Sequence, residues 1–332
     1  MERPALPDES PPVAHAHATA VCAVSDGRAG NVRQAEALAD ALGRQTTPHC
    51  TLEPRVPWRF VAPVRLPRSD RAFGEHFRSL LATPPALAIG CGRQAALATR
   101  LLRERGAQVV QILDPRIAPR HWDLLVVPQH DAVRGANVLT LLGSLNPVDD
   151  AWLLQARDAF AVFAELPQPR TAVLLGGSSA HARFDRSAFE VLASKLEVSL
   201  ARDGGSVLVT TSRRTPADLV AALRHRYVET PGLVWCGEAD GANPYTGVLA
   251  WADRIVCSPD SVNMVSEACA TRVPVHVFDP SRVSGRPRRF LDSLLQNGRI
   301  RVMDTALAAF PVEPLRETAR VAAIVRERLA LL

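Results

Sequence analysis

Short apolar runs alternate with stretches in which apolar residues recur at helical spacing, and this alternation continues through most of the chain. The first example is an apolar run at 20–25, which is followed by Ala35, Leu38 and Leu42 at helical spacing. Strands that alternate with helices are typical of βα units, in which parallel strands form one sheet. We therefore predict an α/β fold with strands near residues 20–25, 86–89, 108–113, 124–127, 138–141, 172–175, 207–210, 233–235, 254–256 and 275–277.

Pro167 and Pro169 mark a boundary near the middle of the chain, because proline interrupts helices and sheet ladders alike. A new series of strands begins directly after them. The sequence thus predicts a disordered tail followed by two Rossmann-like domains. The predicted boundaries are 1–18 for the tail, 19–148 for the first domain, 149–169 for a connecting helix and linker, 170–312 for the second domain, and 313–332 for a C-terminal helix that packs back across the domains.

The segment 251–278 changes its apolar period twice, which predicts a strand, a polar loop, a helix and a second strand. The apolar run at 254–256 breaks at 258–261, and apolar residues then recur at helical spacing until the run at 275–277. In open parallel sheets, ligands bind beyond the carboxyl ends of the strands, and a helix that begins there offers N–H groups to an anion. We therefore expect an anion site at this break, with Ser261 as a contact.

Three polar side chains, Asp260, Asn263 and Glu267, follow the spacing of one face of the predicted helix. Glu267 lies about 9 Å beyond Ser261 along the helix axis at 1.5 Å per residue. A ribose attached to a bound diphosphate is expected at about that place, and a carboxylate accepts hydrogen bonds from its two hydroxyls. We predict that Asn263 and Glu267 belong to a nucleotide site. The alternative is a surface helix with a solvated glutamate.

The second half of the chain begins with a strand that runs directly into Gly176, Gly177 and Ser178. Glycine permits close approach of the backbone to a phosphate, and serine adds a hydroxyl donor. We predict that these three residues contact a diphosphate. A tight turn without a ligand is the alternative explanation of the same residues.

Two further loops complete the predicted nucleotide site. Ser212 and Arg213 follow the next strand, beside a helix start that we place at Thr215 as cap. A guanidinium binds phosphate oxygens through two hydrogen bonds, and a helix N-terminus adds to the attraction. Asn243 and Tyr245 are expected to bound a pocket for the base. The simpler explanations are an exposed basic loop and an Asn-Pro turn.

The charge and the cysteines narrow the class of ligand. A net charge of +5 mildly favours anionic ligands. The basic residues are scattered among acidic ones, however, and we identify no basic patch with interleaved aromatics. Nucleic acid is therefore not expected as a partner. The six cysteines lie far apart without metal-ligand spacing, as expected of small buried residues in a reducing compartment, and no metal site is predicted.

No apolar run is long enough to span a membrane, and the first eighteen residues lack the apolar core of a signal peptide. We therefore expect a cytoplasmic protein that contacts the inner membrane peripherally at most. The sequence gives no indication of the oligomeric state.

Several of these motifs together resemble a known family. The residues VSDGRAGN at 24–31, TSRRTP at 211–216 and NPYTGVLAWAD at 243–253 are similar to those of the mitochondrial fission ELM family. LLGGSS at 174–179 and the segment 251–278 resemble the nucleotide-binding half of GT-B glycosyltransferases. The resemblance implies a GT-B-like fold, in which two Rossmann-like domains face each other across a cleft. It also implies that Glu267 binds the ribose and that Gly176, Gly177, Ser178 and Ser261 contact the diphosphate.

The loop at 26–31 is the candidate catalytic loop of the first half. Asp26 is expected to act as general base toward an acceptor hydroxyl and Arg28 to stabilise a leaving diphosphate, with Asn31 completing the set. The GT-B transferases that the chain resembles carry a Gly-Gly-His loop here, and this chain has no histidine within the loop. Cys91 is a less favoured nucleophile, because no histidine partner is apparent.

Three functions are compatible with the sequence. The first is a GT-B-type transfer of sugar from a nucleotide-diphosphate sugar to an unknown, membrane-associated acceptor. This transfer is expected to need no metal cofactor, because arginines and helix N-termini can stabilise the leaving diphosphate. The second is a nucleotide-sugar epimerase of the same fold. The third, which the ELM resemblance implies, is a non-catalytic adaptor.

Overall fold

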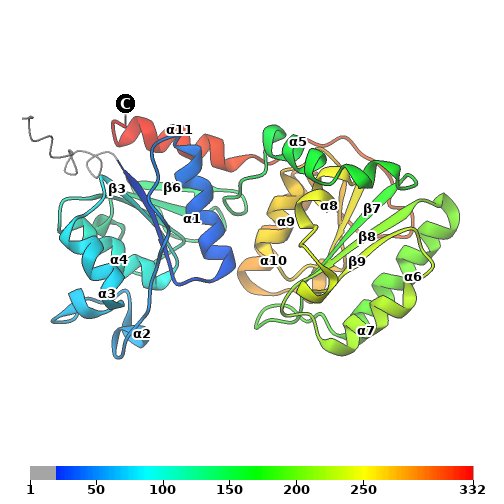
Figure 1. Cartoon of the computed structure of the whole chain (residues 1–332), viewed down its shortest axis with the longest axis horizontal. Helices are drawn as coiled ribbons and strands as arrows, with labels where there is room; N and C mark the ends of the chain where they lie inside the picture. The colour runs from blue at the N-terminus through cyan, green and yellow to red at the C-terminus, as the bar shows by residue number, and fades with distance from the viewer. Residues whose placement is uncertain (1–19, 332) are drawn as a thin grey trace, which may run out of the picture. The chain divides into compact units, whose positions relative to one another are not determined.

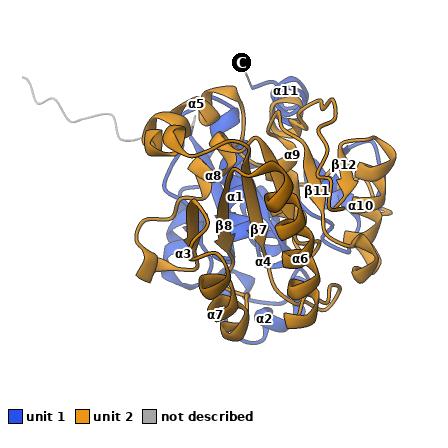
Figure 2. Cartoon of the chain, turned by 90° about the vertical axis from the view of Figure 1, so that its right-hand side faces the viewer, with its two compact units in different colours: residues 1–127, 133–140, 321–332 blue, residues 128–132, 141–320 orange. Residues whose placement is uncertain are grey.

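The computed structural model describes residues 20–331, which form two compact units. Unit 1 contains residues 20–127, 133–140 and 321–331, and unit 2 contains residues 128–132 and 141–320 (Figure 2). The tail predicted at 1–18 lies outside the described residues. Within the described part of the chain, no helix combines the length and the apolar character needed to cross a membrane.

Unit 1 is built on a six-stranded sheet in the order β2, β1, β3, β4, β5, β6. Parallel pairing joins β1 to β2 and β3, β3 to β4, and β4 to β5. All five residues of β1 are buried, as expected for a parallel strand that is covered on both faces. The strands are β1 (Val21–Ser25), β2 (Cys50–Thr51), β3 (Leu87–Cys91), β4 (Gln108–Ile112), β5 (Leu124–Pro128) and β6 (Val138–Leu141).

Most of the last helix of the chain, from residue 321 onward, belongs to unit 1. The guanidinium groups of Arg326 and Arg328 donate to the carbonyl oxygens of Ala41 and Ala136, which fixes the helix to this unit. The helices of unit 1 are α1 (Ala29–Ala41), α2 (Trp58–Val61), α3 (Gly74–Ala82), α4 (Arg93–Arg103) and α11 (Glu317–Arg328), with short 3-10 turns at Ser69–Arg71 and Pro119–His121 (Figure 1).

Unit 2 contains a second six-stranded parallel sheet, in the order β12, β11, β10, β7, β8, β9. Successive residues of the central strand β7 enter opposite cores, with Leu174 in one hydrophobic cluster and Val173 and Leu175 in the other. Both sheet faces are therefore buried. The strands are β7 (Arg170–Leu175), β8 (Ser206–Thr211), β9 (Gly232–Trp235), β10 (Arg254–Cys257), β11 (Val275–Val277) and β12 (Ile300–Val302).

Helices connect the strands of unit 2 in the alternation that the sequence predicted. Asp185 caps the longest of them by accepting a hydrogen bond from the backbone N–H of Ala188. The helices are α5 (Asp150–Ala159), α6 (Arg186–Asp203), α7 (Ala217–Arg226), α8 (Tyr245–Trp251), α9 (Val262–Cys269) and α10 (Gly285–Gln296), with 3-10 turns at Ala161–Glu165, Glu238–Asp240 and Pro280–Arg282.

The two parallel sheets with their connecting helices confirm the predicted α/β class. Strands β2 and β12 were not predicted, because two or three residues are too few to show a period. The proline-rich stretch before residue 67, which reads as a loop, contains the short helix α2.

Arg299 closes the end of α9 in unit 2. Its buried guanidinium donates to the carbonyl oxygens of Cys269 and Thr271 at 2.9 Å each and of Ala268 at 3.4 Å. Burial lowers the pKa of Arg299 from its ordinary value. The carbonyl of Ala268 also accepts from the N–H and the hydroxyl of Thr271, and that of Cys269 accepts from the N–H of Leu315, so Arg299 adds to these bonds at the end of the helix.

We expect Arg299→Met to lower the free energy of unfolding by about 2 kcal/mol, because the carbonyl of Thr271 loses this donor and the carbonyls of Ala268 and Cys269 each lose one of theirs. Urea unfolding followed by circular dichroism measures the change. Arg289→Met, at an exposed position on α10, is the matched control and is expected to change little. An equal loss in both variants would contradict the role of Arg299.

Candidate functional site

Three loops of unit 2 meet where neighbouring parallel strands end. The register pairs Leu175 of β7 with Thr211 of β8, and Leu174 of β7 with Cys257 of β10. The loops that follow these strands therefore emerge at the same edge of the sheet. They contain most of the predicted nucleotide-binding residues.

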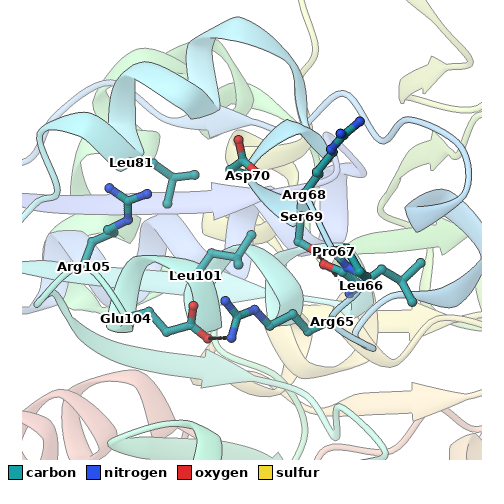
Figure 3. Close-up of a pocket in the computed structure, with 10 residues that line it drawn as sticks. All are labelled: Arg65, Leu66, Pro67, Arg68, Ser69, Asp70, Leu81, Leu101, Glu104 and Arg105. Carbon is teal, nitrogen blue, oxygen red and sulfur yellow. Dashed lines mark hydrogen bonds and ion pairs between the residues drawn. The ribbon is translucent and has the colours of Figure 1, made fainter.

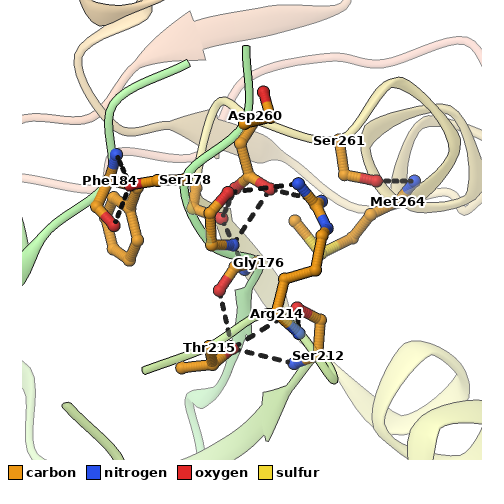
Figure 4. A network of polar contacts seen from close by, with 12 residues as sticks. Gly176, Ser178, Phe184, Ser212, Arg214, Thr215, Asp260, Ser261 and Met264 are labelled. Carbon is orange, nitrogen blue, oxygen red and sulfur yellow. Dashed lines mark hydrogen bonds and ion pairs between the residues drawn. The ribbon is translucent and has the colours of Figure 1, made fainter. Parts of the chain in front are cut away.

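Asp260 holds the three loops together (Figure 4). Its fully buried carboxylate accepts hydrogen bonds from Gly177 N–H at 3.1 Å, from the Ser258 hydroxyl at 2.6 Å and from the Arg214 guanidinium at 2.7 Å. Ser258 in turn accepts a hydrogen bond from the N–H of Gly176 at 2.8 Å. An internal carboxylate thus occupies the anion position that these amides create.

Glycine is required at 176 and 177 by the protein's own groups. A Cβ atom on Gly176 would lie 2.0 Å from Oδ2 of Asp260, and one on Gly177 would lie 2.2 Å from the carbonyl oxygen of Arg214. The Gly-Gly pair is therefore explained by the close approach of Asp260 and Arg214. In this structure the two amides that we predicted to contact a phosphate donate to Ser258 and Asp260 instead.

The loop after β8 uses different residues from those that the sequence indicated. Arg214 reaches Asp260, whereas Arg213 is exposed and forms no ion pair within residues 20–331. Thr215 is not the helix cap, because α7 begins at Ala217 with Pro216 at the cap position. The Thr215 hydroxyl donates to the carbonyl oxygen of Gly176 at 2.6 Å and accepts a hydrogen bond from the N–H of Ser212 at 3.1 Å.

Ser261 is the N-cap of α9, and its hydroxyl accepts a hydrogen bond from the N–H of Met264 at 3.3 Å. Asn263 lies half-buried in the first turn of the same helix. The remaining N–H groups of that turn and the positive end of the helix dipole are available to attract an anion. The predicted strand, loop and helix at this place are confirmed.

Tyr245 and Glu267, which the sequence singled out separately, form one pair. The Tyr245 hydroxyl donates to Oε2 of Glu267 at 2.5 Å. Asn243 accepts a hydrogen bond from the backbone N–H of Tyr245 at 3.0 Å and so shapes the start of α8. The alternative of a solvated surface glutamate is wrong, because Glu267 is 2 % exposed and residues 265–269 are all buried.

Ser178 is engaged within its own loop. Its hydroxyl donates to the carbonyl oxygen of Phe184 at 3.0 Å and accepts from the N–H of the same residue at 3.1 Å. The two bonds close the loop between β7 and α6. The Ser178 hydroxyl therefore has a structural role in addition to any contact with a ligand.

In unit 1, the predicted catalytic loop brings its three candidates together. Oδ1 of Asp26 accepts from the side-chain amide of Asn31 at 2.9 Å and from the N–H of Arg28 at 3.3 Å. The exposed guanidinium of Arg28 lies 3.4 Å from Oδ2 of Asp26. Asp26 is thus oriented by two neighbours at the carboxyl end of β1, beside the start of α1.

His49 is a neighbour of this loop that sequence reasoning missed. Its Nε2 lies 2.9 Å from the Ser25 hydroxyl, which also accepts a hydrogen bond from the N–H of Gly27 at 3.1 Å. Nδ1 of His49 lies 3.2 Å from a carboxylate oxygen of Glu36, a close pair without hydrogen-bond alignment. Burial lowers the pKa of His49 and outweighs Glu36, which raises it. No local pattern connects residues 24 positions apart.

The environment of Cys91 does not favour a nucleophilic role. The thiol is completely buried, and burial raises its pKa well above the usual range, with the negative charge of Asp26 adding to the shift. It donates to Oδ1 of Asn31 at 3.6 Å. The thiol therefore stays protonated and supports the loop.

The fold of the whole chain is similar to that of solved nucleotide-sugar enzymes. The UDP-GlcNAc 2-epimerase from Methanocaldococcus jannaschii superposes with a TM-score of 0.57 over 93 % of this chain and 99 % of that protein, at 12 % sequence identity. The UDP-N-acetylglucosamine 2-epimerase from Rickettsia bellii gives 0.52 over 94 % and 96 %, at 11 % identity. The two Rossmann-like sheets and these similarities confirm the predicted GT-B-like fold.

Sequence comparison identifies relatives over most of the chain. The mitochondrial fission protein ELM1 of Arabidopsis thaliana is 29 % identical over 277 residues, which cover 74 % of this chain and 64 % of the plant protein. An uncharacterized protein of Rickettsia prowazekii, RP120, is 25 % identical over 93 % of this chain and 98 % of its own length. Residues 29–329 match the family model described as mitochondrial fission ELM1, and the chain belongs to this family.

Proposed function

We propose that unit 2 binds a nucleoside-diphosphate sugar at the carboxyl ends of β7, β8 and β10, and that the protein transfers the sugar to an acceptor. The observation that carries the proposal is the convergence of three strand-end loops around the start of α9, with Arg213 and Arg214 beside it. This combination of a helix N-terminus and two guanidinium groups suits a diphosphate.

The hydrogen-bond donors proposed for the diphosphate are those that the protein's own acceptors leave accessible. Arg213 has no ion pair among residues 20–331, and the Arg214 side chain is 45 % exposed while it pairs with Asp260. We therefore assign the diphosphate to these two arginines and to the first turn of α9. The amides of Gly176 and Gly177 build the floor of the site, because Asp260 and Ser258 already accept from them.

The Tyr245–Glu267 pair is the proposed ribose contact. One carboxylate oxygen of Glu267 is held by the Tyr245 hydroxyl, which fixes the orientation of the carboxylate. A preoriented acceptor binds a diol at a lower entropic cost than a mobile one. Asn243 and Tyr245, at the start of α8, are the proposed boundary of the base pocket.

For the transfer step we assign Asp26 as general base and Arg28 as an electrostatic contact, with Asn31 orienting Asp26. Arginine and a helix dipole can stabilise a leaving diphosphate, so the proposal does not depend on a metal ion. The acceptor is proposed to be membrane-associated, and the protein to act in the cytoplasm at the membrane surface.

Two specific observations favour other functions. The structurally similar proteins named above are UDP-GlcNAc 2-epimerases, which makes an epimerase of the same site the second candidate. The carboxylate of Asp260 fills the position where a ligand anion would bind, and one relative is a mitochondrial fission protein. Both observations favour a non-catalytic adaptor as the third candidate. The experiments below separate the three.

Thermal unfolding across UDP-, GDP-, CMP- and ADP-sugars tests ligand binding. A ligand that binds the folded protein stabilises it by about 2.7 kcal/mol at a concentration one hundred times its Kd, and we expect one nucleotide class to do so. Glu267→Gln should reduce the shift, whereas the exposed Glu229→Gln should retain it. If no nucleotide changes the transition of the unsubstituted protein, both enzyme proposals fail and the adaptor remains.

The two arginines after β8 should contribute separately to affinity. Arg213→Gln and Arg214→Gln are each expected to weaken nucleotide binding about 10- to 100-fold, since a charge-assisted hydrogen bond to phosphate contributes about 1.5–3 kcal/mol. Isothermal titration with the nucleotide identified above measures the effect. Arg289→Gln on α10 is the charge-matched control, and equal weakening by all three substitutions would indicate a general electrostatic effect rather than a site.

Incubation with the bound nucleotide-sugar, without acceptor, separates transferase from epimerase. A transferase should leave the sugar configuration unchanged, and Asp26→Asn should abolish transfer while nucleotide affinity in unit 2 is retained. Nuclear magnetic resonance of the recovered nucleotide-sugar detects epimerisation. An isomerised sugar would replace the transferase proposal by the epimerase one.

A further inference from the structure

One short segment of unit 1 carries most of the net charge of the protein. Residues 54–71 contain five arginines and one aspartate, a net charge of +4, against +5 for the whole chain. The expectation that the basic residues are scattered among acidic ones is therefore wrong for this segment. The segment also interleaves Trp58 and Phe60 with these arginines, which the sequence analysis overlooked.

The same segment exposes apolar side chains at intervals of four residues. Val56 and Phe60 are each 68 % exposed and Val64 is 49 % exposed. One third of the exposed large hydrophobic residues in the described chain lie between positions 56 and 64. Phe60 is the aromatic residue in that set. Isolated exposed apolar residues need no explanation, but a group beside a concentration of charge indicates a contact surface.

The exposure does not come from a frayed loop, because the main chain of the segment is tied to α4. The Arg93 guanidinium donates to the carbonyl oxygens of Arg59 and Phe60 at 3.0 Å each, and Arg100 donates to the carbonyl oxygen of Pro63 at 2.6 Å. The backbone thus faces the protein, and the apolar side chains remain exposed. Both views place α2 at the edge of unit 1 opposite α11 (Figures 1 and 2).

Most of the guanidinium groups of the segment have no acidic partner. Arg65 pairs with Glu104 at 3.0 Å, but Arg55, Arg59, Arg68 and Arg71 form no ion pair within residues 20–331. Exposed arginines that form no ion pair retain more of their attraction for an external anion than paired ones do.

A hollow of about 380 Å³ continues this surface (Figure 3). Arg65, Arg68 and Arg105 line it together with two carboxylates, Asp70 and Glu104, which leaves one positive charge in excess, and Leu81 and Leu101 contribute apolar lining. A cavity with both characters accepts a phosphate group together with the start of an apolar chain. The hollow therefore adds a second place on this surface where an amphiphilic anion could bind.

We propose that residues 54–71 form a docking surface for an anionic lipid bilayer, with Phe60, Val56 and Val64 inserted at the boundary of headgroups and acyl chains. The arginines then lie at the level of the lipid phosphates, where each basic residue contributes about fivefold to binding. Single-stranded nucleic acid fits less well, because it binds on several exposed aromatic rings, whereas Trp58 donates its indole N–H to Ser69 and only Phe60 projects.

Co-sedimentation of the full chain with vesicles tests the surface. We expect binding to vesicles of equal parts phosphatidylcholine and phosphatidylglycerol, weaker binding to phosphatidylcholine alone, and loss of binding in high salt. Arg55→Gln with Arg59→Gln should weaken binding about 25-fold, at about fivefold per arginine. Val56→Ser with Phe60→Ser should weaken it by at least about tenfold, because apolar area no longer leaves water.

The controls are surface residues of unit 2 with the same chemistry. Val228, which is 76 % exposed, is replaced by Ser, and the exposed Arg289 is replaced by Gln; both variants are expected to bind like the unsubstituted protein. Absent vesicle binding, equal binding to both lipid compositions, or equal losses in the controls would overturn the proposal. So would segment-dependent binding to a single-stranded oligonucleotide in place of vesicles. None of these outcomes depends on the nucleotide site.

Discussion

The buried carboxylate of Asp260 is the contact on which the architecture of the loops after β7, β8 and β10 depends. It links the loop after β10 to Gly177 after β7 and to Arg214 after β8, and through Ser258 it also reaches Gly176. A buried charge is costly unless it is paired and fully hydrogen-bonded, so these partners must hold their positions. The same requirement excludes a side chain at 176 and 177.

This arrangement changes how the Gly-Gly motif is understood. Strand-end glycines are commonly taken as a phosphate cradle, but here their N–H groups already serve protein acceptors. A diphosphate would therefore depend on guanidinium groups and on the first turn of α9, next to a carboxylate that partly offsets their charge. Affinity in such a site depends on the balance between Arg213, Arg214 and Asp260, which links the structural role of Asp260 to ligand selection.

Two polar features of unit 1 lie in different segments of its chain, the loop after β1 and the segment 54–71. The loop after β1 orients Asp26 through Asn31 and is supported from beneath by the Ser25–His49 contact and the buried Cys91. The segment 54–71 instead presents unpaired charge and apolar side chains on a backbone that is fixed to α4. The proposed transfer to an acceptor at a membrane would use both properties, and they lie in different elements.

The sequence by itself determined the α/β class, most strands and the places where polar loops follow strand ends, because burial on both faces of a parallel sheet leaves a local apolar period. It also located the loops that contain Gly176 and Ser261, and the helix that carries Glu267. Only the tertiary structure decided that Arg214 rather than Arg213 reaches Asp260, that Tyr245 holds Glu267, and that His49 lies beside Ser25. These contacts join residues far apart along the chain, so they depend on strand register and helix packing, which no local pattern encodes.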